Sequence, residues 1–252
     1  MQGAFSHMEL VLGRQKTDAL AKARIAVFGV GSVGSFVTEA LARCGVGSLT
    51  LVDHDSFSED EICRQLYATR SMIGQSKVSV AGRHIHDIDE NILVHCYETA
   101  YSKQTAPMFD LTQFDYIVDT LPKPEDKLVL IEEAAAKGVK ILSCMCLNRF
   151  TDISRLTVAD ITKASVCPVA KELRAELRKA GIRSLKVLFS SEARRKGHTE
   201  AEERPDESTA SGSIFYLTGA AGLMIAREVV RDITDSGEPA IKKPRIRRHG
   251  DK

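Results

Sequence analysis

Residues 24–55 read RIAVFGVGSVGSFVTEALARCGVGSLTLVDHD, and this stretch decides the fold. An apolar run leads directly into the pattern Gly29-x-Gly31-x-x-Gly34, and a helical pattern and a second apolar run follow before Asp53. A strand, a glycine turn, a helix and a second parallel strand make up the first half of a nucleotide-binding, doubly wound sheet.

The three glycines have separate tasks in such a turn. Gly29 permits the tight turn, Gly31 lets backbone amides approach a phosphate, and Gly34 lets the helix pack closely on the strand. The phosphate then lies at the positive N-terminus of the helix. Asp53 follows about 20 residues later, where an acid accepts hydrogen bonds from ribose hydroxyls, the alternative being an acid that only shapes a turn. The stretch therefore predicts a nucleotide site.

Composition limits the classes of protein that remain. A chain of 252 residues suits one large α/β domain. Its net charge of +1 means that nucleic-acid binding would need a local basic patch. The six cysteines include no CxxC pair, which predicts free thiols in a reducing cytoplasm and no structural zinc site. No run has the length and apolarity of a signal peptide or a membrane span, so we expect no membrane contact.

Strand and helix patterns alternate through the first 150 residues. Short apolar runs over 92–97, 115–119 and 139–144 predict three more strands, and helical patterns cover 77–86 and 128–137. Strands that alternate with helices of this length predict an α/β fold with a doubly wound, mainly parallel, Rossmann-like sheet.

The second half predicts antiparallel strands that extend this sheet. The expected strands cover 155–161 and 186–189, the helices cover 169–180 and 220–230 with a strand-like stretch before the latter, and 192–210 reads as a polar surface loop. We predict one domain over 1–234, with a nucleotide half at about 20–150 and a substrate or dimer half at about 151–234. A basic tail over 235–252 is expected to be disordered.

The order of motifs after the glycine turn resembles one family. LVDHD at 51–55 is followed by ICRQL at 62–66 and IGQSKV at 73–78. This order resembles the ThiF/MoeB/HesA superfamily, the ubiquitin-activating-enzyme-like adenylating proteins. Within it, ADITKASVCP at 159–168 and SGSI at 211–214 resemble the branch of tRNA threonylcarbamoyladenosine dehydratases (TcdA, also CsdL).

The resemblance implies an adenylating enzyme that uses ATP and Mg²⁺. In such proteins a carboxylate attacks the α-phosphate to give an acyl adenylate and pyrophosphate. In the dehydratase branch the carboxylate belongs to threonylcarbamoyladenosine in tRNA, which then cyclises with net loss of water. This chemistry depends on positioning and charge neutralisation. By resemblance, Arg64 and Lys77 contact the phosphates and are the catalytic residues.

The resemblance also implies a set of ATP-binding residues, while no residue is assigned as a metal ligand. The set consists of Gly29, Gly31, Gly34, Asp53, Asp55, Arg64, Gln65 and Lys77. The plain alternative for Arg64 and Lys77 is that both are solvated surface cations.

Four positions depart from the family pattern. Cys63 replaces an asparagine, Pro122 replaces a second acid that supports Mg²⁺ after the fourth strand, and His7 replaces an N-terminal arginine that reaches across a dimer. Arg14 is the candidate substitute for that arginine. The glycine-rich turn after the fifth strand reads CMCLN at 144–148. These changes affect the phosphate and metal end of the site, and they put the adenylation activity in doubt.

Other functions therefore stay open beside the dehydratase. One is a catalytically weakened nucleotide-binding relative that acts as a partner or regulator, and another is an adenylating enzyme for a sulfur-carrier protein. An NAD dehydrogenase is disfavoured by the predicted phosphate-binding cations. The resemblance further implies a homodimer in the cytoplasm, with tRNA and sulfur-transfer proteins as partners. Basic runs at 174–183, 194–196 and 242–248 are candidates for contact with RNA phosphates or are simply solvated faces.

Overall fold

A seven-stranded sheet forms the centre of the molecule, in a computed structural model that describes residues 4–164, 167–192 and 212–235. The strands are β1 Arg24–Phe28, β2 Ser48–Val52, β3 Leu93–Tyr97, β4 Tyr116–Asp119, β5 Ile141–Cys144, β6 Leu156–Asp160 and β7 Lys186–Ser190. Their order is β3-β2-β1-β4-β5-β7-β6. All neighbours pair in parallel except β6 and β7, which pair antiparallel. The predicted fold class is confirmed.

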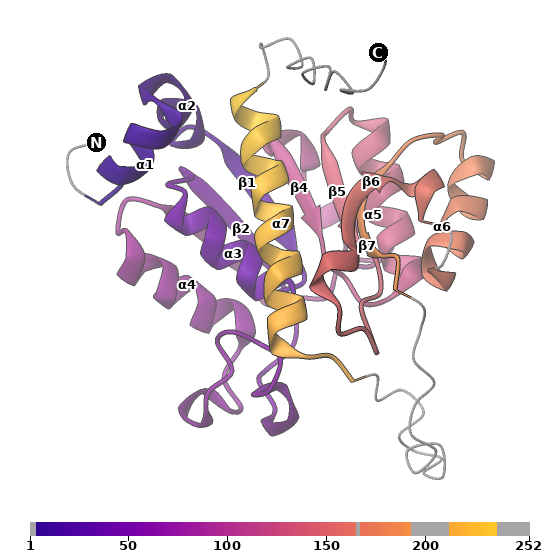
Figure 1. The fold of residues 1–252 in the computed structure, drawn as a ribbon, viewed down its shortest axis with the longest axis horizontal. Helices are drawn as coiled ribbons and strands as arrows, with labels where there is room; N and C mark the ends of the chain where they lie inside the picture. The colour runs from indigo at the N-terminus through magenta and orange to yellow at the C-terminus, as the bar shows by residue number, and fades with distance from the viewer. Residues whose placement is uncertain (1–3, 165–166, 193–211, 236–252) are drawn as a thin grey trace, which may run out of the picture.

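Helices cover both faces of this sheet (Figure 1). They are α1 Ser6–Leu12, α2 Arg14–Leu20, α3 Gly34–Arg43, α4 Lys77–Ile88, α5 Pro124–Ala136, α6 Pro168–Lys179 and α7 Phe215–Thr234. Short 3-10 turns lie at Glu59–Glu61, Arg70–Met72, Ala106–Met108, Leu111–Gln113, Ile153–Arg155 and Ile161–Lys163. Residues of α3, α4 and α7 share one core with the sheet, and residues of α5 and α6 belong to cores on the other side.

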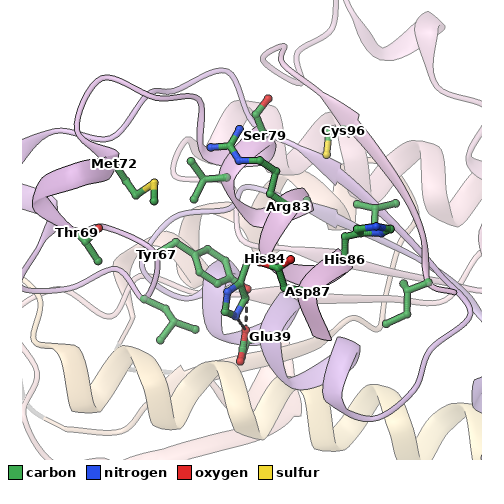
Figure 2. A pocket seen from close by; sticks show the side chains of 15 residues that line it. Glu39, Tyr67, Thr69, Met72, Ser79, Arg83, His84, His86, Asp87 and Cys96 are labelled. Atoms are coloured by element: carbon green, nitrogen blue, oxygen red, sulfur yellow. Dashed lines mark hydrogen bonds and ion pairs between the residues drawn. The ribbon is translucent and has the colours of Figure 1, made fainter. Parts of the chain in front are cut away.

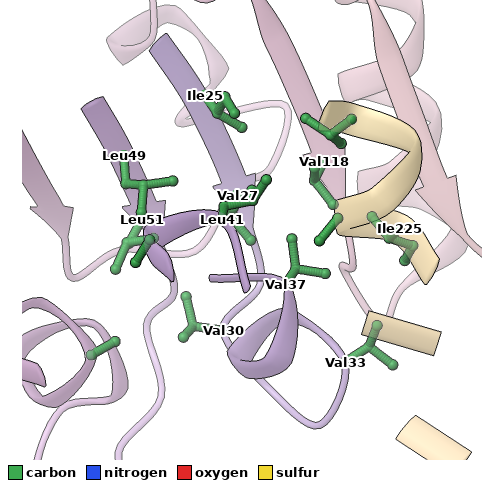
Figure 3. Close-up of a cluster of buried hydrophobic side chains, with 14 of the residues drawn as sticks. Ile25, Val27, Val30, Val33, Val37, Leu41, Leu49, Leu51, Val118 and Ile225 are labelled. Carbon is green, nitrogen blue, oxygen red and sulfur yellow. The ribbon is translucent and has the colours of Figure 1, made fainter. Parts of the chain in front are cut away.

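Alternation along β1 explains why both faces need helices. Ile25 and Val27 belong to the core shared with α3 and α7, whereas Ala26 and Phe28 belong to the core beneath α5. All four side chains are at most 1% exposed. Figure 3 shows Ile25 and Val27 together with side chains from β2, β4, α3 and α7. A strand buried on both faces is typical of a parallel sheet.

The start of the last helix differs from the prediction. A strand-like stretch was expected before a helix over 220–230, but the helix begins at Phe215 and residues 212–214 lie in no strand. The ring of Phe215 packs edge-on against the ring of Phe36 at a centroid distance of 4.9 Å, so the helix contacts α3 from its first residue. A Cβ on Gly222 would lie 2.5 Å from the Cβ of Phe36, so α7 approaches α3 too closely for any larger residue.

The N-terminal helices lie at the amino ends of the strands, opposite the glycine turn (Figure 1). Gly13 separates α1 from α2 with a φ of +80°, as expected for a residue that breaks a helical run. The rings and side chains of Phe5 and Met8 pack within about 4 Å of the Cβ position of Gly45, just before β2.

Several predictions fall outside the described residues. The polar loop expected over 192–210 lies there except for Glu192, as do the basic runs at 194–196 and 242–248 and the tail after Asp235. Among the described helices, none combines the length and apolarity that a membrane span requires.

Candidate functional site

The candidate site lies where the order of the sheet reverses. The central strand β1 pairs with β2 on one side and with β4 on the other. In doubly wound sheets, ligands bind outside the carboxyl ends of the strands at this point. The glycine turn after β1 and the 120–123 segment after β4 both leave the sheet here.

The three glycines of the turn have different surroundings. Gly29 has a φ of +90°, and a Cβ there would lie 2.8 Å from the carbonyl oxygen of Thr120. A Cβ on Gly34 would lie 1.9 Å from the carbonyl oxygen of Gly29, so the turn closes on itself at this point. Next to Gly31 there is open space, since the nearest atom to its Cβ position is Gln65 Nε2 at 4.0 Å. Only glycine therefore fits at Gly29 and Gly34, and the space beside Gly31 leaves room for a ligand.

Free backbone donors face that space. The N–H groups of Gly31, Ser32 and Val33 donate to no acceptor within the described part of the chain, and α3 begins at the next residue. Unpaired donors at the start of a helix attract anions, because the helix dipole adds positive charge there. The turn therefore has the donors that a phosphate group needs.

A hydrogen bond to Asp53 holds this turn against the end of β2. Its Oδ2 accepts a hydrogen bond from the N–H of Val30 at 2.6 Å, and its Oδ1 accepts one from the N–H of Asp55 at 2.9 Å. A carboxylate has about four acceptor positions, so two remain for a ribose. Asp53 is thus both the turn-shaping acid and a residue able to bind ribose.

Lys77 and Arg64 meet at one buried carboxylate. The Lys77 side chain is 3% exposed, and its Nζ lies 2.8 Å from Glu61 Oε1 and 3.2 Å from Asp55 Oδ2. The guanidinium of Arg64 lies 3.7 Å from the same Glu61 oxygen, which also accepts a hydrogen bond from Gln65. Lys77 is therefore no solvated surface cation, and the structure brings it together with Arg64, Gln65 and Asp55.

Glu61 is the member of this cluster that the sequence analysis missed. Its other oxygen accepts the N–H of Ser58, which completes a capping box at the 3-10 turn Glu59–Glu61. The spacing Ser58-x-x-Glu61 is the signal that was available for such a box. Nothing in the sequence indicated that this glutamate also anchors the two cations.

The ammonium of Lys77 keeps its charge in this setting. Burial favours the neutral amine, but the hydrogen bond to Glu61 and the charges of Asp53, Glu61 and Asp55 outweigh it and raise the pKa of Lys77. Arg64 is more loosely held, since its nearest partner is the exposed Asp60, 3.2 Å away. Arg64 can therefore exchange Asp60 for a phosphate at small cost.

The opposite wall of the site contains a second buried ion pair. Asp119 is fully buried and lies 3.1 Å from the Nζ of Lys127, which also donates to the carbonyl oxygen of Cys144 at 2.8 Å. Ser143 and the N–H of Leu121 also donate to this carboxylate. Lys127 and Ser143 were not predicted as site residues, because neither belongs to a local sequence motif.

The turn after β4 does not fit a magnesium ion. Pro122 has no ligand atom, and both oxygens of Asp119 already accept hydrogen bonds. Asp53, His54 and Asp55 have ligand atoms within 4.8 Å of one another, but Mg²⁺ prefers oxygen ligands to imidazole. The residues after β4 therefore do not form a binding site for Mg²⁺.

A cavity of about 210 Å³ lies between these two walls. Arg64 is the predicted site residue that lines it. The other lining residues are Ser32, Val33, Thr120, Leu121, Pro122, Lys127, Cys144, Met145, Cys146, Leu147, Asn148, Val169, Ser213 and Thr218. The turn that departs from the family's glycine-rich pattern, CMCLN, thus forms one side of the cavity.

A larger cavity of about 980 Å³ lies along α4 and is lined by none of the predicted residues (Figure 2). The carboxylate of Glu39 contacts three side chains at this cavity. It lies 2.6 Å from Arg43 Nε and 2.8 Å from His84 Nε2, and it accepts a hydrogen bond from Tyr67 at 3.3 Å. The nucleotide-binding turn lies elsewhere, so size alone would have misplaced the site.

Two departures from the family pattern, His7 and Cys63, and the candidate substitute Arg14 do not line the cavity. His7 and Arg14 belong to the helices at the amino ends of the strands, so in the same chain they lie away from the glycine turn (Figure 1). Cys63 is exposed, and its Sγ donates to the carbonyl oxygen of Asp60 at 3.4 Å.

The cysteines give no sign of nucleophilic chemistry. All six are free, as predicted. Burial raises the pKa of Cys144 to about 12, so its thiol stays neutral at the wall of the cavity. The basic run at 174–183 is also partly occupied, because Arg174 donates to carbonyl groups of 161–164 and Lys179 pairs with Glu176.

Comparisons with known proteins show the family and the fold of the chain. A model of the ThiF family matches residues 6–249. A tRNA threonylcarbamoyladenosine dehydratase of Bacillus subtilis is 35% identical over 239 residues, covering 91% of this chain and 94% of the relative. Its counterpart in Haemophilus influenzae is 32% identical, covering 67% of this chain and 66% of the relative. The solved Escherichia coli tRNA N6-threonylcarbamoyladenosine dehydratase, in complex with ATP, superposes with a TM-score of 0.83 at 22% identity, covering 92% of this chain and 94% of that one.

Proposed function

Because the chain belongs to the ThiF family, we propose that it is an ATP-dependent tRNA threonylcarbamoyladenosine dehydratase. It activates the carboxylate of the modified nucleoside by adenylation and cyclises it with loss of water. The observation that carries the proposal is the arrangement at the carboxyl end of β1. Free amides of the glycine turn, the Arg64 and Lys77 cations and a small cavity lie side by side there.

Each predicted residue has a role in this proposal. The amides of 31–33 bind the phosphates, and Arg64 and Lys77 neutralise the charge that builds up as pyrophosphate leaves. Asp53 accepts hydrogen bonds from the ribose while it holds the turn in place. Gln65 and Asp55 keep the two cations in position through Glu61 and Lys77.

The reaction balances without a covalent intermediate on the protein. A carboxylate oxygen of the substrate attacks the α-phosphorus of ATP, and the bond to the β-phosphate oxygen breaks to release pyrophosphate. A nucleophilic atom of the same side chain then attacks the acyl carbon and loses its proton, while AMP leaves with one former carboxylate oxygen. The nucleoside ends one water lighter, and ATP ends as AMP and pyrophosphate.

Magnesium enters this proposal with the nucleotide. Mg²⁺ commonly keeps several waters and is bound through substrate phosphates together with only one or two carboxylates. The buried Asp119–Lys127 pair leaves the turn after β4 without a free carboxylate.

We also propose that the active form is a homodimer. Leu10 and Val11 on α1 are 84% and 83% exposed, and Tyr216 and Leu223 on α7 are 50% and 56% exposed. Exposed apolar side chains of this size are typical of an interface. A second copy would also be the only way for His7 or Arg14 to approach a nucleotide site. Sedimentation analysis of the Leu10→Glu variant tests this, with a shift from dimer to monomer expected.

The remaining expectations complete the proposal. We propose that residues 1–234 act as a single unit, since one continuous sheet includes strands from both halves. We propose a cytoplasmic location from the free cysteines together with the resemblance, and sulfur-transfer partners from the resemblance alone.

The decisive experiment combines the purified protein with ATP, Mg²⁺ and tRNA that contains threonylcarbamoyladenosine. We expect pyrophosphate release together with a nucleoside that mass spectrometry finds lighter by one water. tRNA without the modification is the control, and it should release no pyrophosphate.

The same experiment tests the weakened relative, which the occupied Asp119 favours as the second candidate. ATP binding without either product would support a nucleotide-binding partner or regulator and would contradict the dehydratase.

A further inference from the structure

The loop after β5 contains an unusual arginine. Arg149 has a φ of +64°, and among the described residues it is the only non-glycine with a positive φ. This conformation costs an ordinary side chain about 1 kcal/mol or more, whereas glycine adopts it freely. An arginine at a position suited to glycine indicates that its side chain has a use, because strained backbone clusters at functional sites.

The loop around Arg149 is fixed in place. Its N–H donates to the carbonyl oxygen of Gly212 at 2.9 Å, which joins this loop to the segment before α7. Leu147 and Asn148 on one side and Ser213 on the other line the 210 Å³ cavity. Arg149 therefore lies next to the residues that line the proposed active site, and its side chain is exposed and forms no ion pair with any described residue.

A second cation lies on the neighbouring loop. Lys123 is exposed, directly precedes α5, and lies between Pro122, which lines the cavity, and Pro124. Two prolines restrict the backbone on both sides of it. It makes no ion pair with a described residue. Arg149 and Lys123 thus come from the loops after β5 and β4, and both loops contribute residues that line the cavity.

We propose that Arg149 and Lys123 form an RNA-phosphate clamp at the mouth of the cavity. The clamp holds the polynucleotide backbone beside the nucleoside that enters the site. This inference rests on the proposed function, because that function makes RNA the partner. Arginine and lysine that neutralise phosphates provide much of the affinity for nucleic acids without reading sequence.

The test measures affinity for tRNA as a function of salt, in wild type, Arg149→Gly and Lys123→Ala. We expect each variant to bind about three- to tenfold more weakly, and the slope of log affinity against log salt to fall by about 0.7 to 0.9. ATP affinity should stay unchanged. The melting temperature of Arg149→Gly should hold or rise, because glycine removes the backbone strain.

Two controls separate charge from structure. Arg149→Lys keeps the charge and should keep most of the affinity, and Lys22→Ala removes a cation at the amino end of β1 and should change nothing. An unchanged salt slope in Arg149→Gly would overturn the clamp. So would a loss of ATP affinity, which would place Arg149 in the nucleotide site, or a wild type that does not bind tRNA.

Failure of the clamp and failure of the proposed function give different results. If tRNA binds with the expected dependence on Arg149 but is never dehydrated, the clamp stands and the dehydratase fails. If the nucleoside is dehydrated with equal KM for tRNA in wild type and both variants, the dehydratase stands and the clamp fails.

Discussion

The two walls of the site use the same kind of ion pair in opposite ways. On the β2 side, the lysine Lys77 pairs with Glu61 and with Asp55, whose side chain is 51% exposed. On the β4 side, Lys127 pairs with Asp119, and the two side chains are 3% and 0% exposed. The Lys77 pair includes the exposed Asp55, which a ligand can replace, whereas the Lys127–Asp119 pair is buried and cannot be reached by a ligand. The comparison suggests that the β2 wall binds the nucleotide and that the β4 wall supports the fold.

The largest expected effect is the loss of stability on breaking the buried Lys127–Asp119 ion pair. Lys127→Ala leaves the carboxylate of Asp119 buried without a cation, which typically costs about 3–5 kcal/mol of unfolding free energy. Urea denaturation measures this loss. The double variant Asp119→Asn, Lys127→Met removes both charges and should recover much of the stability. If the single variant loses under 1 kcal/mol, the β4 wall is not the structural one.

The next effect concerns the exchangeable wall. Lys77→Ala should lower the rate of pyrophosphate release about 10²- to 10³-fold, because a preorganised charge near the leaving phosphates is lost. Its loss of stability should be smaller than that of Lys127→Ala, since Arg64 and Gln65 still contact Glu61. Rapid-quench kinetics and urea denaturation on the same variant compare the two quantities. A stable variant with full activity would remove Lys77 from the site.

A smaller effect is expected where the glycine turn meets β2. Asp53→Ala removes the acceptor for the N–H of Val30 and the proposed ribose contact, so ATP should bind about ten- to a hundredfold more weakly. Calorimetric titration with ATP measures the change, and Asp89→Ala, in a turn before β3, is the matched control. Equal affinities in wild type and Asp53→Ala would contradict the ribose assignment.

The smallest expected effect is that of pH on ATP affinity. The pKa of Lys77 is raised above its ordinary value of about 10.4, so the ammonium is present in both folded and unfolded chains below that pH. The stability that it contributes is complete there and is lost only as the pH rises through the higher folded-state pKa. ATP affinity should therefore not fall through deprotonation of Lys77 between pH 7 and about pH 10. A decline in wild type that Lys77→Arg abolishes would show that the lysine is less well paired.

The sequence predicted the glycine turn and Asp53 on the β2 wall because their signals are local. Gly29, Gly34 and Asp53 follow from backbone conformation and strand spacing within one supersecondary unit, and the structure shows the steric reason for both glycines. Arg64, Gln65 and Lys77 were named by resemblance, and they do lie together. Their roles in catalysis stay predictions.

The β4 wall could not be predicted in the same way. Asp119, Lys127 and Ser143 come from a strand, a helix and a second strand, and only the tertiary fold brings them together. A lysine in a helix is usually exposed, so the pattern of α5 gave no reason to bury Lys127. The start of α7 was missed for a related reason, because the contact between Phe215 and Phe36 joins segments that are far apart in the sequence.

The contact between α7 and the site has a consequence for how the protein is made. Thr218 lines the cavity and its Oγ1 donates to the carbonyl oxygen of Arg64 at 3.3 Å, so a residue near the end of the fold supports one in its first third. During synthesis on the ribosome, the glycine turn, Asp53 and Lys77 emerge long before this support does. A nascent or truncated chain that stops before α7 therefore carries the binding residues without the helix that completes their wall. We therefore expect competence to bind a nucleotide to arise late in translation, once α7 has been synthesised.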